Sequence, residues 1–285
     1  MIVLSTIQEI HEWSAVQRAA GHSVGFVPTM GYLHEGHISL ISAAKHDNDV
    51  VLASIFVNPT QFAAGEDLSR YPRDFERDCS MLSANGCTAL FAPTVDTMYP
   101  PGFSITVHVD GVTSEFEGLV RPSHFDGVAL VVTRLLCLTT PTRLYLGQKD
   151  LQQTAVLRRL VLDLGLNTTV HIVPTVRDAD GLAKSSRNVY LSPAERSKAL
   201  VLSRALRHVT REALNGTSES SRLLETALAV LHSEPDVLID YIAIVDPVSM
   251  KSISNISHSS ESACIIAARV GSTRLIDNCF VLQGL

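Results

Sequence analysis

Short apolar runs alternate with stretches of helical periodicity from residue 24 to about residue 175. Runs of four to eight apolar residues that stop at Pro, Gly or polar residues predict buried strands. Near-continuous apolar strands separated by helices are typical of a parallel sheet covered on both faces, so we expect an α/β fold with a Rossmann-like parallel sheet. The expected strands are Val24–Val27, Val50–Val57, Ala89–Ala92, Arg143–Leu146 and Thr168–Val173, and the expected helices include Gly127–Leu138 and Leu151–Leu164.

The pattern changes after Pro174. A polar, turn-rich segment is followed by two amphipathic helices, from Ser192 to about Asn215 and from Ser218 to about Ser233, and then by strands at 241–245 and 263–268. Ser192, Pro193 and Glu195 have the spacing of a helix start with a capping box. We therefore expect two domains, residues 1–175 with the parallel sheet and residues 176–285 as a smaller α+β domain.

Composition and charge exclude several classes of protein. The chain has 285 residues, 46% of them hydrophobic and 18% charged, which is typical of a folded globular protein. The net charge of −6 argues against a nucleic-acid or membrane surface, and the longest apolar run, 128–138, is too short to span a bilayer. Five cysteines without a Cys-x-x-Cys pair indicate reduced thiols in a cytoplasmic protein, and the N-terminus lacks the pattern of a signal peptide.

Two histidines three residues apart, His34 and His37, stand where a strand and a Gly-containing turn lead into a helix. Residues i and i+3 share a helix face, and a helix N-terminus favours a bound anion, so both rings could face one phosphate. The alternative is a pair of surface histidines in a loop. A zinc site of the metalloprotease type is less consistent with the sequence, because that pattern places its histidines at i and i+4.

Further polar clusters fall at expected strand ends and after the domain boundary. Lys184, Ser185, Ser186 and Arg187 offer two cations and two hydroxyls, a combination that suits a triphosphate. Ligands in such folds sit at the carboxyl ends of strands. Those ends carry Thr29-Met30-Gly31, Asn58-Pro59-Thr60-Gln61 and Gly147-Gln148-Lys149-Asp150, with Gln153 one helical turn beyond Lys149. Taken singly, each glutamine could be an ordinary surface residue.

With these residues in place, the chain resembles the pantoate–β-alanine ligases (pantothenate synthetases), within the adenylyl-transferring superfamily that includes the class I aminoacyl-tRNA synthetases. The resemblance lies in motifs that follow the family's order along nearly the whole chain. They include Pro28-Thr29-Met30-Gly31 through His37, Phe56–Phe62, Tyr71-Pro72-Arg73, Gly147-Gln148-Lys149-Asp150 and Ser185-Ser186-Arg187-Asn188.

The resemblance implies an ATP-dependent condensation of pantoate with β-alanine through a pantoyl-adenylate, with release of AMP and pyrophosphate. It implies Mg²⁺ as cofactor, a cytoplasmic homodimer, residues 1–175 as the nucleotide- and pantoate-binding domain and residues 176–285 as a lid. The implied catalytic residues are His34, His37, Lys149 and Arg187. The implied ATP-binding residues are Pro28, Met30, His34, His37, Gly147, Lys149, Asp150, Val176, Lys184, Ser185, Ser186 and Arg187. The implied pantoate-binding residues are Met30, Asn58, Gln61 and Gln153.

Two positions depart from the family pattern, and two other functions stay open. Lys184 stands where many relatives are expected to have an apolar residue, and Arg77 precedes Asp78 in the acidic segment near the expected metal, so the metal ligands are left unassigned. The alternatives are a nucleotidylyltransferase that stops at an adenylylated product and a nucleotide-binding protein without catalytic activity. The intact motifs argue against the second, and the Asn-Pro-Thr-Gln-Phe segment argues against the first.

Overall fold

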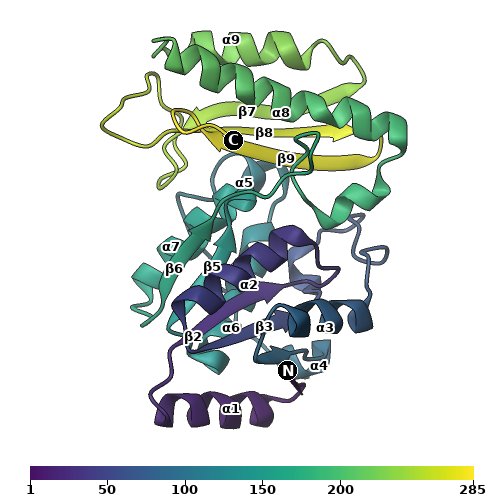
Figure 1. Ribbon diagram of the computed structural model, residues 1–285, viewed down its shortest axis with the longest axis vertical. Helices are drawn as coiled ribbons and strands as arrows, with labels where there is room; N and C mark the ends of the chain where they lie inside the picture. Colours follow the sequence, from purple (N-terminus) through teal and green to yellow (C-terminus); the bar gives the residue numbers. More distant parts are fainter. The chain divides into compact units, whose positions relative to one another are not determined.

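The computed structural model describes all residues from 1 to 285, which form two compact units (Figure 1). The first unit contains residues 1–147 and 156–173, and the second contains residues 148–155 and 174–285. None of the helices has both the length and the apolar character that a bilayer crossing requires.

The first unit is built on a six-stranded parallel sheet with the strand order β1-β4-β3-β2-β5-β6. Its register places Phe26 opposite both Leu52 and Leu144. The chain moves outward from β2 through β3 and later returns to the other side of β2 at β5, so the strand order reverses there, and such a point is where these folds bind ligands. The strands are β1 (Ile2–Leu4), β2 (Val24–Thr29), β3 (Val50–Ile55), β4 (Ala89–Phe91), β5 (Arg143–Gly147) and β6 (Thr169–Val173).

Helices cover both faces of this sheet, because successive strand residues point to opposite sides. Phe26 belongs to the core under α1 (Ile7–Ala19), α6 (His124–Thr139) and α7 (Leu151–Asp163). The next residue, Val27, belongs to a separate core under α2 (Glu35–Asp47) and α3 (Phe75–Ala84). Shorter helical segments are η1 (Pro59–Gln61), α4 (Val95–Met98) and α5 (Glu117–Val120). The Rossmann-like parallel sheet expected from the sequence is confirmed.

The second unit contains a three-stranded antiparallel sheet in the order β7 (Val237–Val245), β8 (Ala263–Val270), β9 (Thr273–Phe280). Helices α8 (Pro193–Leu214) and α9 (Ser220–Leu231) pack side by side on one face of it (Figure 1). The capping box at the start of α8 is present as expected: the Ser192 hydroxyl accepts a hydrogen bond from the Glu195 amide, and the Glu195 carboxylate accepts one from the Ser192 amide. The unit also contains η2 (Gln148–Asp150) and η3 (Ser186–Tyr190).

Several elements are longer than the sequence predicted, and some were not predicted at all. β7 begins at Val237, before the predicted start at Tyr241, and α6 begins at His124, before Gly127. No prediction covered β1, α1, α3 or β9. β9 lacks an uninterrupted apolar run, because Asp277 and Asn278 occupy two of its buried positions.

Candidate functional site

The two predicted histidines lie at the start of α2, where His34 is the N-cap and His37 is the third helical residue. The Nδ1 atom of His34 accepts a hydrogen bond from the Gly36 amide at 3.1 Å, and the Nδ1 atom of His37 accepts one from the His34 amide at 3.2 Å. The centroids of the two rings are 4.1 Å apart. The structure therefore places the two imidazoles side by side, and each ring caps backbone groups of the helix.

These contacts determine which ring nitrogen carries the proton. An Nδ1 atom that accepts a hydrogen bond has no proton, so the neutral rings of His34 and His37 are protonated at Nε2. Each Nε2–H can then donate to an anion, beside the positive end of the helix dipole. This arrangement can stabilise negative charge without either ring being protonated a second time.

A buried carboxylate holds the turn before α2. The Asp78 oxygens accept hydrogen bonds from the Tyr32 amide at 2.7 Å and the Leu33 amide at 2.8 Å, and only 1% of Asp78 is exposed. These bonds stabilise an unusual backbone, since Gly31 and Tyr32 both have positive φ angles, 81° and 50°. Burial raises the pKa of the Asp78 carboxyl. This supporting role could not be predicted from the sequence, because no local pattern relates residue 78 to residues 32 and 33.

The residues present do not form a protein cage for a metal ion. Nowhere in the chain do three His, Cys, Asp or Glu side chains converge as ligands of a metal. Both carboxylate oxygens of Asp78, the acidic residue near the expected metal, already accept hydrogen bonds from backbone amides. The magnesium implied by the sequence resemblance would therefore rely mainly on the phosphates of ATP, as Mg²⁺ often does.

The structure brings together three residues predicted to bind pantoate. The Asn58 Nδ2 atom donates to Gln61 Oε1 at 3.0 Å and to the Gly127 carbonyl at 3.1 Å, and the Tyr99 hydroxyl donates to Asn58 Oδ1 at 2.9 Å. The Gln61 Nε2 atom points to the Met30 sulfur at 3.2 Å. Because Asn58 binds the oxygen of the Gln61 amide, the nitrogen of that amide is directed toward Met30.

Next to Gln61, a partly buried histidine supports the backbone of η1. The Nδ1 atom of His124 lies 2.9 Å from the Gln61 carbonyl oxygen, and its Nε2 atom lies 3.1 Å from the Arg121 guanidinium. Burial and the neighbouring Arg121 charge lower the pKa of His124 to about 4. The neutral ring thus donates from Nδ1 to Gln61 and accepts from Arg121, which also binds Glu66 through two nitrogens at 2.8 and 2.7 Å.

In the second unit, Lys149 lies in η2, directly after β5, with its Nζ 3.4 Å from Asp150 Oδ1. The segment 177–184 forms a hairpin that leads into the Lys184–Arg187 cluster. The Lys184 ammonium lies 2.6 Å from Asp178, whose other carboxylate oxygen binds Arg196 at 2.7 Å. Although burial raises the pKa of Asp178, hydrogen bonds from Lys184 and Arg196 hold it below its usual value.

The predicted site residues are thus distributed over both units. The first unit contains Pro28, Met30, His34, His37, Asn58, Gln61 and Gly147. The second contains Lys149, Asp150, Gln153, Val176, Lys184, Ser185, Ser186 and Arg187.

Comparison with known proteins gives a consistent result. The family model described as pantoate-beta-alanine ligase matches residues 2–280. A pantothenate synthetase from Roseiflexus castenholzii is 48% identical over 278 residues, which cover 98% of this chain and 99% of that protein. A crystal structure of pantothenate synthetase from Thermus thermophilus superimposes with a TM-score of 0.92 at 48% identity, covering 99% of both chains.

A Francisella tularensis pantoate-beta-alanine ligase, crystallised with beta-gamma ATP and beta-alanine, has a TM-score of 0.78 at 33% identity and covers 100% of this chain and 99% of that one. The chain therefore belongs to the pantoate–β-alanine ligase family, the ligases that condense pantoate with β-alanine.

Proposed function

We propose that the chain performs this condensation in two half-reactions, with ATP activating pantoate as pantoyl-adenylate before β-alanine attacks. The observation that carries the proposal is the pair of Nε2–H donors on His34 and His37 at the start of α2. In the first step a pantoate carboxylate oxygen attacks the α-phosphorus of ATP and pyrophosphate leaves. The attack brings two anions together, so donors preorganised toward the phosphates lower the barrier.

We assign the phosphate contacts to the residues that the sequence resemblance implies. His34 and His37 donate from Nε2, Lys149 and Lys184 supply positive charges, and Arg187 supplies a planar group with several donors. The hydroxyls of Ser185 and Ser186 add neutral donors. The remaining ATP contacts are assigned to the base and ribose, through Pro28, Met30, Gly147, Asp150 and Val176.

Pantoate is assigned to Met30, Asn58, Gln61 and Gln153. The Gln61 Nε2–H group faces a thioether sulfur, which is a weak acceptor. A hydroxyl or carboxylate oxygen of pantoate is a better acceptor and can take over that bond with the Gln61 amide unmoved, because Asn58 already holds its oxygen.

In the second half-reaction the amine of β-alanine attacks the acyl carbon of the adenylate, forming the amide bond and releasing AMP. Positioning the amine is the main requirement of this step, and we assign no general base. Mg²⁺ would enter with the phosphates of ATP, since the chain offers it no cage of its own. Reduced cysteines favour the cytoplasm, and the family resemblance favours a homodimer.

The test is AMP formation from ATP and pantoate, with and without β-alanine. We expect AMP only when both pantoate and β-alanine are present. A nucleotidylyltransferase would release pyrophosphate and keep an adenylylated product, and a protein without catalytic activity would release neither. Absence of AMP under every condition would contradict the proposal.

Variants of His37 test the assigned donor. His37→Asn keeps an acceptor near Nδ1 but lacks a donor at the Nε2 position, so we expect a loss of about 100-fold or more in kcat for the first half-reaction. His37→Gln retains a donor near that position, and we expect it to recover part of the rate. His46→Ala, at the exposed end of the same helix, is the matched control and should behave as the unaltered protein. Equal rates for all three variants would refute the role of His37.

A further inference from the structure

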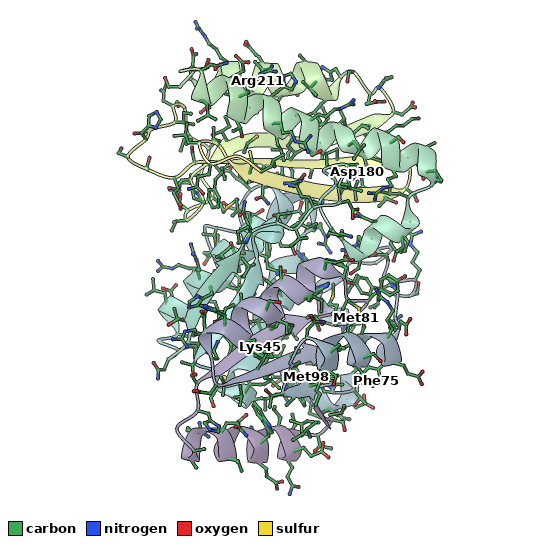
Figure 2. The ribbon with its side chains drawn as sticks, in the orientation of Figure 1. Lys45, Phe75, Met81, Met98, Asp180 and Arg211 are labelled. Carbon is green, nitrogen blue, oxygen red and sulfur yellow. The ribbon has the colours of Figure 1, made fainter.

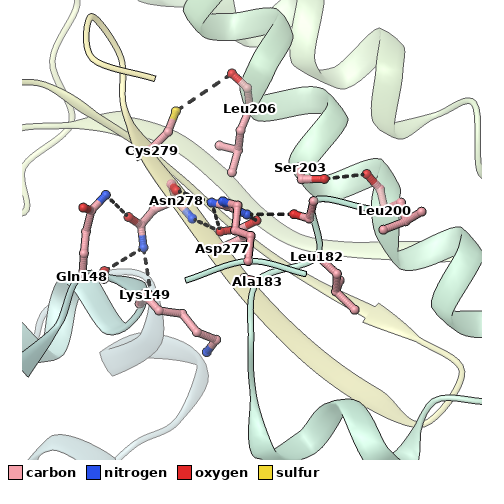
Figure 3. Close-up of polar contacts among 12 residues, drawn as sticks. Gln148, Lys149, Leu182, Ala183, Leu200, Ser203, Leu206, Asp277, Asn278 and Cys279 are labelled. Carbon is pink, nitrogen blue, oxygen red and sulfur yellow. Dashed lines mark hydrogen bonds and ion pairs between the residues drawn. The ribbon is translucent and has the colours of Figure 1, made fainter. Parts of the chain in front are cut away.

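Two neighbouring residues of β9, Asp277 and Asn278, contact two separate segments that carry proposed phosphate-binding side chains (Figure 3). Successive side chains of a strand point to opposite faces, so each residue reaches a different segment. Both are buried in the middle of the strand, with 5% and 2% of their surface exposed.

Asn278 binds the turn that carries Lys149. Its Nδ2 atom donates to the carbonyl oxygens of Gln148 at 3.0 Å and Lys149 at 2.9 Å, and its Oδ1 atom accepts from Gln148 Nε2 at 3.2 Å. Figure 3 shows the Asn278 amide directed at this turn. The amide thus fixes the backbone of η2 and does not contact the ammonium group of Lys149.

Asp277 binds the hairpin that leads into Lys184. Arg177, at the base of the hairpin, donates to both carboxylate oxygens of Asp277, at 2.7 and 2.8 Å. Only 12% of the Arg177 side chain and 4% of the Asp277 side chain are exposed. The same guanidinium donates to the Gly181 carbonyl in the turn of the hairpin and to the Asn278 carbonyl on β9, each at 3.2 Å. A two-pronged, buried ion pair of this kind fixes orientation as well as distance.

The hairpin connects the Arg177–Asp277 ion pair to the Lys184–Arg187 cluster. Arg177 pairs with Ala183 across the hairpin, and the Lys184 amide donates to the Val176 carbonyl at 2.9 Å. A side chain at Gly181 would strain the turn, because φ there is 97°, and its Cβ atom would also displace the Arg207 guanidinium. The backbone at Lys184 is therefore tied to β9 through a short, hydrogen-bonded path.

We propose that Asp277 and Asn278 are positioning residues that hold Lys149 and the Lys184–Arg187 cluster at the spacing one triphosphate requires. This inference rests on the proposed function, because it takes those residues as the phosphate contacts. Both segments belong to the same compact unit as β9. Cations on separate loops can act on one reacting group only if their backbones are mutually fixed, since displacements of about 1 Å can cost up to about 100-fold in rate.

The first experiment separates positioning from general damage to the fold. Asn278→Asp preserves size but turns a carboxylate toward two carbonyl oxygens, and Asp277→Asn preserves size but removes the charge that Arg177 binds. We expect each to lower the rate of pantoyl-adenylate formation by about 10- to 100-fold and to raise the KM for ATP. The KM for β-alanine in the reaction with preformed pantoyl-adenylate should not change. Cys279→Ala is the matched control, because this buried β9 residue contacts Thr210 and Leu206 on α8 and neither segment.

The second experiment asks whether each residue acts through its own segment. If Asn278 acts through Lys149, Asn278→Asp should have little further effect in the Lys149→Ala background, while Asp277→Asn should retain its full effect there. Additive effects for the Asn278–Lys149 pair would overturn the proposal, as would an unchanged KM for ATP in both β9 variants. If instead Lys149→Ala and Arg187→Ala had normal rates, the assignment of the phosphate contacts would fail, and the positioning role would fail with it.

Discussion

His124 is a partly buried imidazole whose two nitrogens contact different partners, the Gln61 carbonyl and the Arg121 guanidinium. A second proton would place a cation beside Arg121 and remove the acceptor at Nε2. Burial together with this neighbouring charge is the reason why the pKa of His124 is lowered to about 4. The role of the residue is therefore determined by its surroundings, and the same histidine on a surface loop would titrate near 6.5.

This shift makes the stability of the protein depend on pH. In the unfolded chain His124 takes up a proton as the pH falls through about 6.5, whereas in the folded protein it stays neutral until about pH 4. The folded state therefore loses stability between these values, by about 3 kcal/mol, and the contribution levels off below pH 4. We expect His124→Asn, which keeps a donor near Nδ1, to show a shallower decline than the unaltered protein. Urea unfolding at several pH values between 7 and 4 measures the difference, and parallel declines would contradict the assignment.

At the scale of single elements, the start of α8 shows how local sequence determines a helix boundary. The Glu195 carboxylate accepts hydrogen bonds from the Ser192 amide and hydroxyl, both at 2.8 Å, and these bonds lower the pKa of Glu195. All of the groups lie within four residues, so the box could be predicted without any knowledge of the fold.

Removing the N-cap side chain should lower the free energy of unfolding by an amount that depends only on neighbouring residues. We expect Ser192→Ala to lower the free energy of unfolding by about 1 kcal/mol, because it leaves an amide of the first turn without its acceptor. Ser197→Ala, at an exposed position inside the same helix, should be neutral or slightly stabilising, since alanine is the better helix former. Chemical denaturation of both variants makes the comparison, and equal stabilities would show that the box contributes nothing.

Gly127 in α6 gives the opposite case, in which packing between elements overrides local preference. Alanine should favour a helix interior over glycine by about 1 kcal/mol. A Cβ atom at Gly127, however, would overlap the Thr60 carbonyl oxygen and lie only 2.6 Å from the Gln61 Cα. The glycine allows α6 to approach η1 closely, and its carbonyl accepts a hydrogen bond from Asn58.

We therefore expect Gly127→Ala to destabilise the protein and to raise the KM for pantoate, because η1 would have to move and Gln61 moves with it. Cys137→Ala, at an exposed position of the same helix, is the control and should leave both quantities unchanged. Thermal unfolding and steady-state kinetics test the two effects separately. A more stable variant with normal kinetics would mean that η1 accommodates the methyl group at no cost.

At the scale of the whole molecule, the predictable features follow from patterns within short stretches. Apolar runs such as 50–55 and helices such as α7 could be read from periodicity, and their alternation predicted the parallel sheet. β9 could not be predicted this way, since two polar residues interrupt it. Its place was decided by packing, since Leu275 and Cys279 of β9 belong to the core of the second unit, whose side chains are drawn in Figure 2.

In the candidate site, too, some features could be predicted from the sequence and others only from the tertiary structure. The sequence alone predicted the α/β class, the family and the residues offered as contacts, because motif residues and helix starts are local and ordered along the chain. The tertiary structure alone decided that His34 and His37 present Nε2–H groups, that Asp78 holds their turn, and that Asp277 and Asn278 hold the segments bearing Lys184 and Lys149. The supports from Asp78, Asp277 and Asn278 join residues 45 to 130 positions apart. Such contacts form only when the chain folds, so no pattern within a short stretch of sequence could have predicted them.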